Sequence, residues 1–332
     1  MTSAEPLLSI RNLNTTFHTN RGPLHAVRNV NFDLQPGEVL GIVGESGSGK
    51  SVTLRSILRL FQPPTQVRGE IFWKGEDVLK ASRRRMLQVT GAEISMIFQE
   101  PMTALNPVLT VGSQILESLN AHEGLRGAAA VTRATELLEL VGIPSPRERL
   151  AAYPHEFSGG MRQRAMIAIA LASSPQLLLA DEPTTALDVT IQDQILKLIL
   201  SLREKLNMSV ILVTHDLGVI AQTCDRVAVM YAGKLVELAP VRNLFTEPKH
   251  AYTVGLRLSL PEGGDSRQPL QPIPGSPPDV TNLPRGCAFA PRCAYVTDAC
   301  REAEPELVQT SEGHLTACIH HAKLPVFGDG KA

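Results

Sequence analysis

The stretch Gly44-Glu-Ser-Gly-Ser-Gly-Lys50-Ser51 decides the fold of this chain. It matches the pattern G-x-x-x-x-G-K-[ST], and it lies between an apolar run at residues 39–43, expected to be a buried strand, and a helical pattern at residues 50–60. The glycines let backbone N–H groups turn inward toward an anion, and the N-terminus of the following helix adds partial positive charge. The pattern therefore predicts a phosphate-binding loop in which Lys50 reaches the β- and γ-phosphates and the Ser51 hydroxyl binds Mg²⁺.

A second run supplies the acids that such a loop needs. Residues 177–180 are apolar, as expected of a buried strand, and Asp181 and Glu182 follow directly. We expect Asp181 to hold Mg²⁺ through water and Glu182 to polarise the water that attacks the γ-phosphate. Two adjacent acids at the end of a strand are also common in solvated turns, so this interpretation depends on the phosphate-binding loop.

Length, composition and charge narrow the class of protein. The chain has 332 residues, which favours about two domains, and its 43% hydrophobic and 20% charged residues are typical of a globular protein. Lys and Arg number 32 against 33 Asp and Glu, so nucleic acid is not an expected partner. The longest apolar run, residues 165–172, is shorter than the roughly 18 residues of a membrane-spanning helix, and residues 1–6 lack the pattern of a secretion signal. We expect a cytosolic chain.

Strand-like and helical patterns alternate from residue 7 to residue 235, which predicts an α/β domain with a largely parallel sheet. Residues 102–165 hold helical patterns without a strand-like run and are predicted to form a helical insertion. Proline and glycine are concentrated in residues 261–285, which indicates a linker or an irregular arm. We divide the chain into a nucleotide-binding domain at residues 1–255 and a C-terminal extension at residues 256–332. Further apolar runs of strand length are residues 94–98, 210–213 and 227–231.

Residues 157–164, Phe-Ser-Gly-Gly-Met-Arg-Gln-Arg, resemble the signature loop of the ATP-binding-cassette ATPases. The common form of that loop is Leu-Ser-Gly-Gly-Gln, so Phe157 and Met161 depart from it, whereas the Ser-Gly-Gly part that faces phosphate in the family is intact. Three other motifs of the family are present, one before this loop and two after it. Gln99 resembles the Q-loop glutamine, Ala186-Leu187-Asp188 resembles the D-loop, and His215 resembles the switch histidine.

The resemblance implies an α/β fold, with a P-loop ATPase core, antiparallel β and helical subdomains, and a small irregular Cys-rich C-terminal element. It also implies a nucleotide sandwich, in which ATP held by the phosphate loop of one subunit is capped by the signature loop of another, so that dimerisation is part of catalysis. The catalytic residues implied are Glu182, His215 and Gln99, and the Mg²⁺ ligands are Ser51, Gln99 and Asp181. The nucleotide contacts implied are Phe17, Gly44, Ser46, Gly47, Gly49, Lys50, Ser51, Ser158, Gly159, Gly160, Asp181 and Asp188.

The adenine contact is an aromatic residue near the start of the chain. Phe17 lies where the family usually carries its stacking tyrosine, and the resemblance implies that its ring stacks on adenine. Residues 19–23 look like a small insertion that shifts the register, so His25 is the alternative. Phe17 can also be read as a core aromatic residue of a first β-hairpin.

Three stretches resemble one branch of the family, the ATPases of dipeptide and oligopeptide importers. Residues 96–107 are similar to the Q-loop stretch of that branch. Residues 249–261 resemble its His-Pro-Tyr-Thr segment, with Ala251 in place of the usual proline, and Ile273-Pro-Gly-Ser-Pro-Pro-Asp279 also matches. The chain is identified as a member of this branch, most similar to the D-type subunits of dipeptide importers.

The branch implies both a location and partners. We expect a peripheral ATPase on the cytoplasmic face of the inner membrane, which drives import of dipeptides or oligopeptides. Its expected partners are two transmembrane permease subunits, a paralogous ATPase subunit or a second copy of this chain, and, indirectly, a substrate-binding protein. Nickel and glutathione importers share this architecture. A soluble cassette ATPase of translation or DNA repair is the alternative from another class.

Four of the five cysteines lie in the tail, where Cys287, Cys293, Cys300 and Cys318 are separated by 5, 6 and 17 residues. Structural zinc usually uses tight C-x2-4-C pairs, which are missing here, whereas a four-thiolate iron–sulfur site tolerates wider spacing. Related D-type subunits carry a [4Fe-4S] cluster in this element, so the resemblance implies one, with Zn²⁺ and free thiols or disulfides as alternatives. Nearby histidines, which could substitute as ligands or be solvated, are His314, His320 and His321.

Overall fold

The computed structural model describes residues 5–20, 22–100, 104–185, 187–259 and 272–327. Internal contacts divide the chain into two units. The first unit comprises residues 1–35, 39–79 and 213–332, and the second comprises residues 36–38 and 80–212. The phosphate-binding loop and the C-terminal extension therefore belong to the first unit, and the signature stretch belongs to the second.

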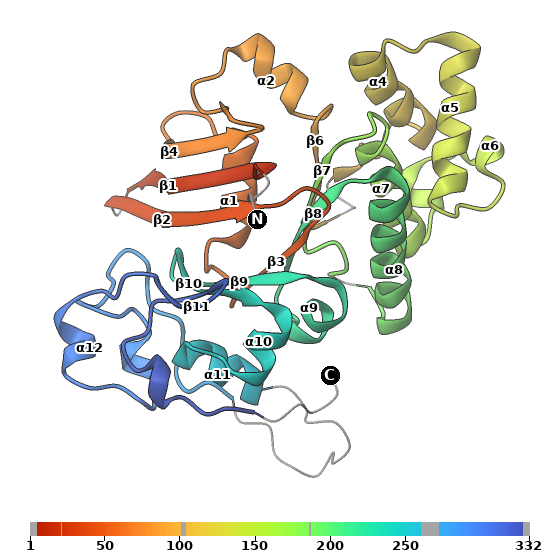
Figure 1. Ribbon diagram of the computed structural model, residues 1–332. Coiled ribbons are helices and arrows are strands. Elements are labelled where there is room, and N and C mark those ends of the chain that lie inside the picture. The colour runs from red at the N-terminus through yellow and green to blue at the C-terminus, as the bar shows by residue number, and fades with distance from the viewer. Residues whose placement is uncertain (1–4, 21, 101–103, 186, 260–271, 328–332) are drawn as a thin grey trace. The chain divides into compact units, whose positions relative to one another are not determined.

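The first unit contains an antiparallel four-stranded sheet (Figure 1). Apolar side chains such as Leu8 and Trp73 are fully buried on it. The hydroxyl groups of Thr15 on the sheet and Ser56 on α1 lie 2.7 Å apart, so the sheet contacts the helix that follows the phosphate loop. The strand order is β2 (Gly22–Leu34), β1 (Leu8–Thr19), β4 (Gln66–Trp73) and β5 (Glu76–Asp77), and the helix is α1 (Lys50–Ile57).

A second set of strands in the first unit joins the cassette core to the C-terminal extension. β3 pairs in parallel with β9, and the other pairs are antiparallel. The extension is expected to be irregular, and this is wrong for residues 308–316, because the free edge of β10 pairs with a short hairpin there. The order is β11 (Val308–Ser311), β12 (His314–Thr316), β10 (Lys234–Pro240), β9 (Arg226–Tyr231) and β3 (Val39–Val43).

The core of the first unit is shared by cassette and extension. Val43 and Val229 on the strands pack in the same cluster as Tyr252 of α11 and Phe289 of the extension. Burial of these aromatic rings removes a large apolar area from water, so the extension contributes to the stability of the unit. The helices are α9 (Leu217–Thr223), α10 (Val241–Thr246), α11 (Ala251–Leu258) and α12 (Ala299–Glu302).

The second unit contains strands in the order β8 (Ser209–Thr214), β7 (Leu177–Asp181) and β6 (Ile94–Ile97). β8 ends just past the boundary of this unit. Every residue of β7 and β8 is buried, which explains why their sequences read as continuous apolar runs. β6 and β7 pair in parallel, from Ile94 opposite Leu177 to Ile97 opposite Ala180. Asp181 therefore stands at the carboxyl end of a buried parallel strand.

Helices make up most of the rest of the second unit. Between residues 104 and 170 the described residues form helices and no strand. In the part of the chain that the structure describes, no helix has the length and apolar character needed to cross a membrane. The helices are α2 (Arg83–Val89), α4 (Val111–Glu123), α5 (Gly127–Leu140), α6 (Pro146–Arg149), α7 (Gly159–Ala170) and α8 (Val189–Leu206).

Candidate functional site

The phosphate-binding loop turns directly from β3 into α1, as the strand and helix patterns predict, although the helix ends at Ile57 and not at residue 60. Gly49 caps the helix with a φ of 101°, and a Cβ there would lie 2.5 Å from the carbonyl oxygen of Ala26. Only glycine therefore fits this position. The amide and hydroxyl of Thr53 donate to the Gly49 carbonyl at 2.9 and 3.0 Å and close the first turn.

Lys50 lies within this loop with 5% of its surface exposed. Its Nζ donates to the carbonyl oxygens of Gly44 at 2.7 Å and Glu45 at 3.0 Å. The ammonium group is therefore held by the same turn whose N–H groups are expected to receive phosphate. Ser51 follows on α1, and Ser46 and Gly47 are exposed at the tip of the loop.

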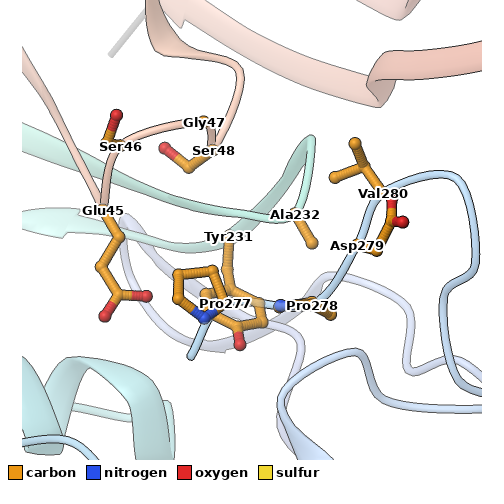
Figure 2. Close-up of a pocket in the computed structure, with 10 residues that line it drawn as sticks. All are labelled: Glu45, Ser46, Gly47, Ser48, Tyr231, Ala232, Pro277, Pro278, Asp279 and Val280. Atoms are coloured by element: carbon orange, nitrogen blue, oxygen red, sulfur yellow. The ribbon is translucent and has the colours of Figure 1, made fainter. Parts of the chain in front are cut away.

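A pocket of about 200 Å³ adjoins the loop. It is lined by residues 45–48 of the loop, by Tyr231 and Ala232, and by residues 277–280 of the extension (Figure 2). All of these residues belong to the first unit. The extension thus reaches the phosphate-binding loop itself, which the sequence patterns do not indicate.

The extension also binds Glu45, the second residue of the loop. The guanidinium of Arg292 donates from Nη1 to Glu45 Oε2 at 2.6 Å and from Nη2 to Oε1 at 2.9 Å. The backbone N–H of Glu45 donates to the Tyr252 hydroxyl at 2.8 Å. Neither Arg292 nor Tyr252 is predicted by sequence motifs to act at this loop, because the contacts join residues more than 200 positions apart.

The second unit brings Gln99 and Glu182 together. Gln99 Nε2 donates to Glu182 Oε2 at 2.9 Å, and the hydroxyl of Thr185 donates to the same oxygen at 2.8 Å. Glu182 has a φ of 46°, in the left-handed region that non-glycine residues seldom adopt. The glutamate carboxylate therefore has a defined orientation, and Thr185 is a contact that the sequence motifs do not single out.

Asp181 is fully buried at the end of β7. A buried carboxylate is stabilised by a nearby cation, and Mg²⁺ prefers oxygen ligands. The hydroxyl of Ser51, the carboxylate of Asp181 and the amide of Gln99 are all oxygen donors, so the chemistry of the predicted ligand set fits Mg²⁺. Ser51 belongs to the first unit, and Asp181 and Gln99 belong to the second.

The signature stretch forms the start of α7. Ser158 caps the helix, and its hydroxyl accepts from the N–H of Met161 at 3.3 Å, while the two glycines begin the helix. A Cβ on Gly160 would lie 2.9 Å from Cγ2 of Ile191 on α8, so a side chain there would push these helices apart. Phe157, which replaces the usual leucine, is 2% exposed and therefore preserves the apolar anchor of the loop.

Asp188 and His215 lie where helices begin. Asp188 caps α8, because its Oδ1 accepts from the N–H of Ile191 at 3.0 Å, and the residue itself is exposed. His215 is an exposed residue that follows β8, and the next residue, Asp216, caps α9. Ala186 of the expected D-loop and residues 101–103 of the expected Q-loop stretch lie outside the described residues.

The two candidates for the adenine contact are neighbours in the first hairpin. Phe17 on β1 is partly buried, and its ring meets Phe61 edge-on with centroids 5.2 Å apart. His25 on β2 is exposed, and its Nδ1 lies 3.0 Å from the hydroxyl of Thr16. Both assignments stay predictions.

The four tail cysteines line one pocket of the extension. Burial raises the pKa of Cys287, Cys318 and Cys293, the last to about 11. No three or more Cys, His, Asp or Glu side chains among the described residues are arranged to hold a metal ion. His314 is not solvated: it is 1% exposed, and its Nε2 lies 2.7 Å from the buried Glu237 carboxylate.

A phosphate loop, an acid-tipped strand with an ordered glutamate, and a Ser-Gly-Gly helix start together define a nucleoside-triphosphatase of the ATP-binding-cassette class. The model of the ABC transporter family matches residues 27–185, and the model of the oligopeptide/dipeptide transporter C-terminal region matches residues 236–300. The chain belongs to the ABC transporter family, and it carries the C-terminal region of the oligopeptide/dipeptide branch. It is an ATPase subunit of that family.

Relatives and solved structures agree with this assignment. The chain is 53% identical over 323 residues to the oligopeptide transport ATP-binding protein OppD of Bacillus subtilis (strain 168), covering 96% of this chain and 90% of the relative. It is 50% identical over 336 residues to the dipeptide transport ATP-binding protein DppD of the same organism, with 98% and 99% covered. A dimeric structure of the ATP-binding cassette MJ0796 in a post-hydrolysis state with ADP and Pi has 29% identity and a TM-score of 0.63, covering 71% of this chain and 99% of that one.

Proposed function

We propose that this chain is the ATP-hydrolysing subunit of an importer that carries dipeptides or oligopeptides across the cytoplasmic membrane. The observation that carries the proposal is the pairing of a cassette with the C-terminal region of oligopeptide/dipeptide transporters in one chain. The near full-length similarity to OppD and DppD supports it. The cassette handles ATP, so the choice among peptides, nickel and glutathione rests with its partner chains.

Nucleotide binding begins at the phosphate loop. On arrival of ATP, Lys50 exchanges its two backbone carbonyl acceptors for the β- and γ-phosphate oxygens. The loop N–H groups and the start of α1 receive the remaining phosphate charge. Ser51, Gln99 and Asp181 would hold Mg²⁺, which neutralises charge that develops on the phosphates. Phe17 stacks on the adenine ring.

Hydrolysis uses the ordered glutamate. The Glu182 carboxylate accepts a proton from the attacking water, whose oxygen bonds to the γ-phosphorus while the bond to the bridging oxygen of ADP breaks. Gln99 and Thr185 hold the carboxylate in the required orientation. His215 contacts the γ-phosphate and donates a further hydrogen bond to the negative charge that leaves with the phosphate product. The products are ADP and inorganic phosphate.

Catalysis takes place between two cassettes. Ser158, Gly159 and Gly160 cap the nucleotide of the neighbouring cassette with the start of α7, and Asp188 adds a contact from the D-loop. The second cassette is a paralogous ATPase subunit or a second copy of this chain. Two transmembrane permease subunits bind the pair at the cytoplasmic face of the inner membrane, where a substrate-binding protein delivers cargo from the other side.

Purification of the tagged chain from detergent-solubilised membranes of its native host tests this proposal. Mass spectrometry then identifies every polypeptide that is retained. Two multi-span membrane proteins and a second cassette ATPase are the expected result, and their identity also reveals the cargo class. Recovery of ribosomal or DNA-repair proteins without a membrane chain would overturn the transport proposal and leave the ATPase chemistry intact.

We also propose that the extension holds a [4Fe-4S] cluster on its four tail cysteines. Their position around one pocket supports this, as does thiol chemistry suited to iron–sulfur ligation. A single zinc ion requires four thiolates about 2.3 Å from one centre, whereas a cluster separates them because each binds a different iron. The cluster would stabilise a small element with little core of its own. The cysteines are Cys287, Cys293, Cys300 and Cys318.

Iron and acid-labile sulfide in anaerobically purified protein test the cluster. The cluster predicts about four of each per chain. A matched variant, Cys224→Ser, changes a thiol far from the pocket in sequence and should retain both. Zinc at one per chain without sulfide, or neither metal nor sulfide, would refute the proposal.

A further inference from the structure

Arg292 is one of the most constrained charged side chains in the extension. It is 6% exposed, and both terminal nitrogens bind the Glu45 carboxylate. Its Nε donates to the Pro274 carbonyl at 2.9 Å, and its Nη1 lies 3.2 Å from the Tyr231 hydroxyl. The guanidinium carbon also lies 5.9 Å from the ring centroids of Tyr231 and Phe289. These contacts fix the plane of the guanidinium, which is the condition for a bidentate pair.

Glu45, the partner of Arg292, lies at the start of the phosphate-binding loop. Glu45 directly follows the glycine that opens the phosphate loop, and the carbonyls of both residues accept from Lys50 Nζ. The Arg292 guanidinium donates to the Glu45 carboxylate, and the Tyr252 hydroxyl accepts from the backbone N–H of Glu45. The first turn of the loop is therefore fixed from the extension and from the loop lysine together.

The two side chains of the pair differ in exposure, 6% for Arg292 and 26% for Glu45, and the pair does not serve stability alone. Glu45 keeps 26% of its side chain exposed, so water can solvate its carboxylate if Arg292 is lost. A loop released in this way samples other conformations, and its N–H groups then no longer converge on phosphate. The larger effect of losing the pair is therefore expected on nucleotide affinity and not on folding.

We propose that Arg292 is a positioning residue for ATP, which acts through Glu45 to hold the phosphate-binding loop in its anion-binding conformation. The C-terminal extension is thereby part of the nucleotide site. Residues 277–280, which line the same pocket as the loop, place a second part of the extension beside it (Figure 2). This inference rests on ATP binding by the cassette and is independent of the cargo.

Binding of a fluorescent ATP analogue to the full-length chain tests the proposal. We expect Arg292→Ala to raise the Kd about tenfold and Arg292→Lys, which keeps the charge but not the fork, to raise it about threefold. Glu304→Gln is the matched control. Glu304 ties the extension to the cassette through Arg28 at 2.9 Å and Lys234 at 2.8 Å, without contacting Glu45, and its loss should leave the Kd unchanged.

A double-mutant cycle separates positioning from folding. Glu45→Gln and Arg292→Gln should each weaken binding, and the double variant should be no weaker than the worse single variant, since each removes the same contact. Thermal unfolding without nucleotide reports stability independently. The proposal is overturned if Arg292→Lys and Arg292→Ala bind the analogue with the original Kd, or if Glu304→Gln weakens binding as much as Arg292→Ala. Additive losses in the cycle would equally overturn it.

Discussion

At the scale of single residues, Glu182 is held both by hydrogen bonds to its side chain and by its backbone conformation. Its carboxylate accepts from Gln99 and Thr185 on one oxygen, and its backbone has a φ of 46°. A left-handed backbone at a non-glycine residue costs of order 1 kcal/mol or more and persists where the surroundings enforce it. Such strain at the expected base is consistent with a side chain held for chemistry.

Replacement of Glu182 by glutamine keeps the shape of the side chain and removes the proton acceptor. We expect ATP binding to be retained and hydrolysis to fall by roughly 100-fold or more, so that a closed dimer accumulates with ATP. Phosphate release and gel filtration with and without ATP measure both effects. Lys50→Ala is the contrasting variant, because it should bind nucleotide poorly. Normal turnover by Glu182→Gln would contradict the assignment.

Thr185 should contribute to turnover through its hydrogen bond to Glu182. Thr185→Val removes the hydroxyl donor at nearly constant shape, and we expect kcat for ATP hydrolysis to fall about tenfold with little change in KM. Thr185→Ser keeps the donor and should retain most of the activity. Equal rates for the valine and serine variants would show that the hydrogen bond has no role in hydrolysis.

The sequence motifs name Gln99 and Glu182 but not their third partner. Residues 181–185 read Asp-Glu-Pro-Thr-Thr, and either threonine could serve by pattern. Thr184 is buried, whereas the hydroxyl of Thr185 reaches the Glu182 carboxylate. The strained backbone at Glu182 determines which of the two threonines does so. A local motif therefore finds the reactive group, and the backbone conformation decides which neighbour orients it.

At the scale of elements, β3 and α9 of the first unit pack in direct contact. A Cβ on Gly41 of β3 would collide with Ile220 and would lie 2.9 Å from the sulfur of Cys224. The glycine lets helix and strand touch, and the thiol fills the remaining space. The apolar pattern predicts that β3 is buried, but periodicity does not reveal which helix lies against it.

Burial raises the pKa of Cys224 from 9.0 to about 12. Since the folded value exceeds the unfolded one, folding favours the protonated thiol, and its contribution to stability is lost as pH rises from about 9 to 12. Iodoacetamide at pH 8 should therefore leave Cys224 unmodified in native protein, because the thiolate is the nucleophile.

Peptide mapping by mass spectrometry before and after unfolding in guanidinium measures this protection. The Cys224 peptide should be modified only after unfolding. Labelling of the native protein at the rate of a free thiol would mean that the strand and helix do not shield it.

At the scale of the whole molecule, the extension is a structural part of the first unit. Phe289 is 3% exposed, and its ring lies 5.3 Å from that of Tyr231 and 5.4 Å from that of Tyr252. Sequence patterns predict the buried strands, because these follow from local composition. They do not predict this shared core or the β10 edge pairing, since these join segments distant in the chain.

Phe289→Ala should lower the free energy of unfolding by about 3 to 5 kcal/mol, because it leaves a cavity among the aromatic rings. Urea titration followed by circular dichroism measures the loss. Val326→Ala, at a residue of the same extension that is 69% exposed, is the control and should change stability by less than about 0.5 kcal/mol. A small loss for Phe289→Ala would mean that extension and cassette unfold separately.

The contact between Arg292 and Glu45 spans 247 positions of the chain. A ribosome makes the phosphate-binding loop first and its arginine much later, at a rate of roughly 5 to 20 residues per second. During that interval the nascent cassette carries every residue of the nucleotide motif but lacks the side chain that grips Glu45. A chain should therefore bind ATP tightly only after its translation has passed Arg292. Incomplete copies should be less able to bind a second cassette.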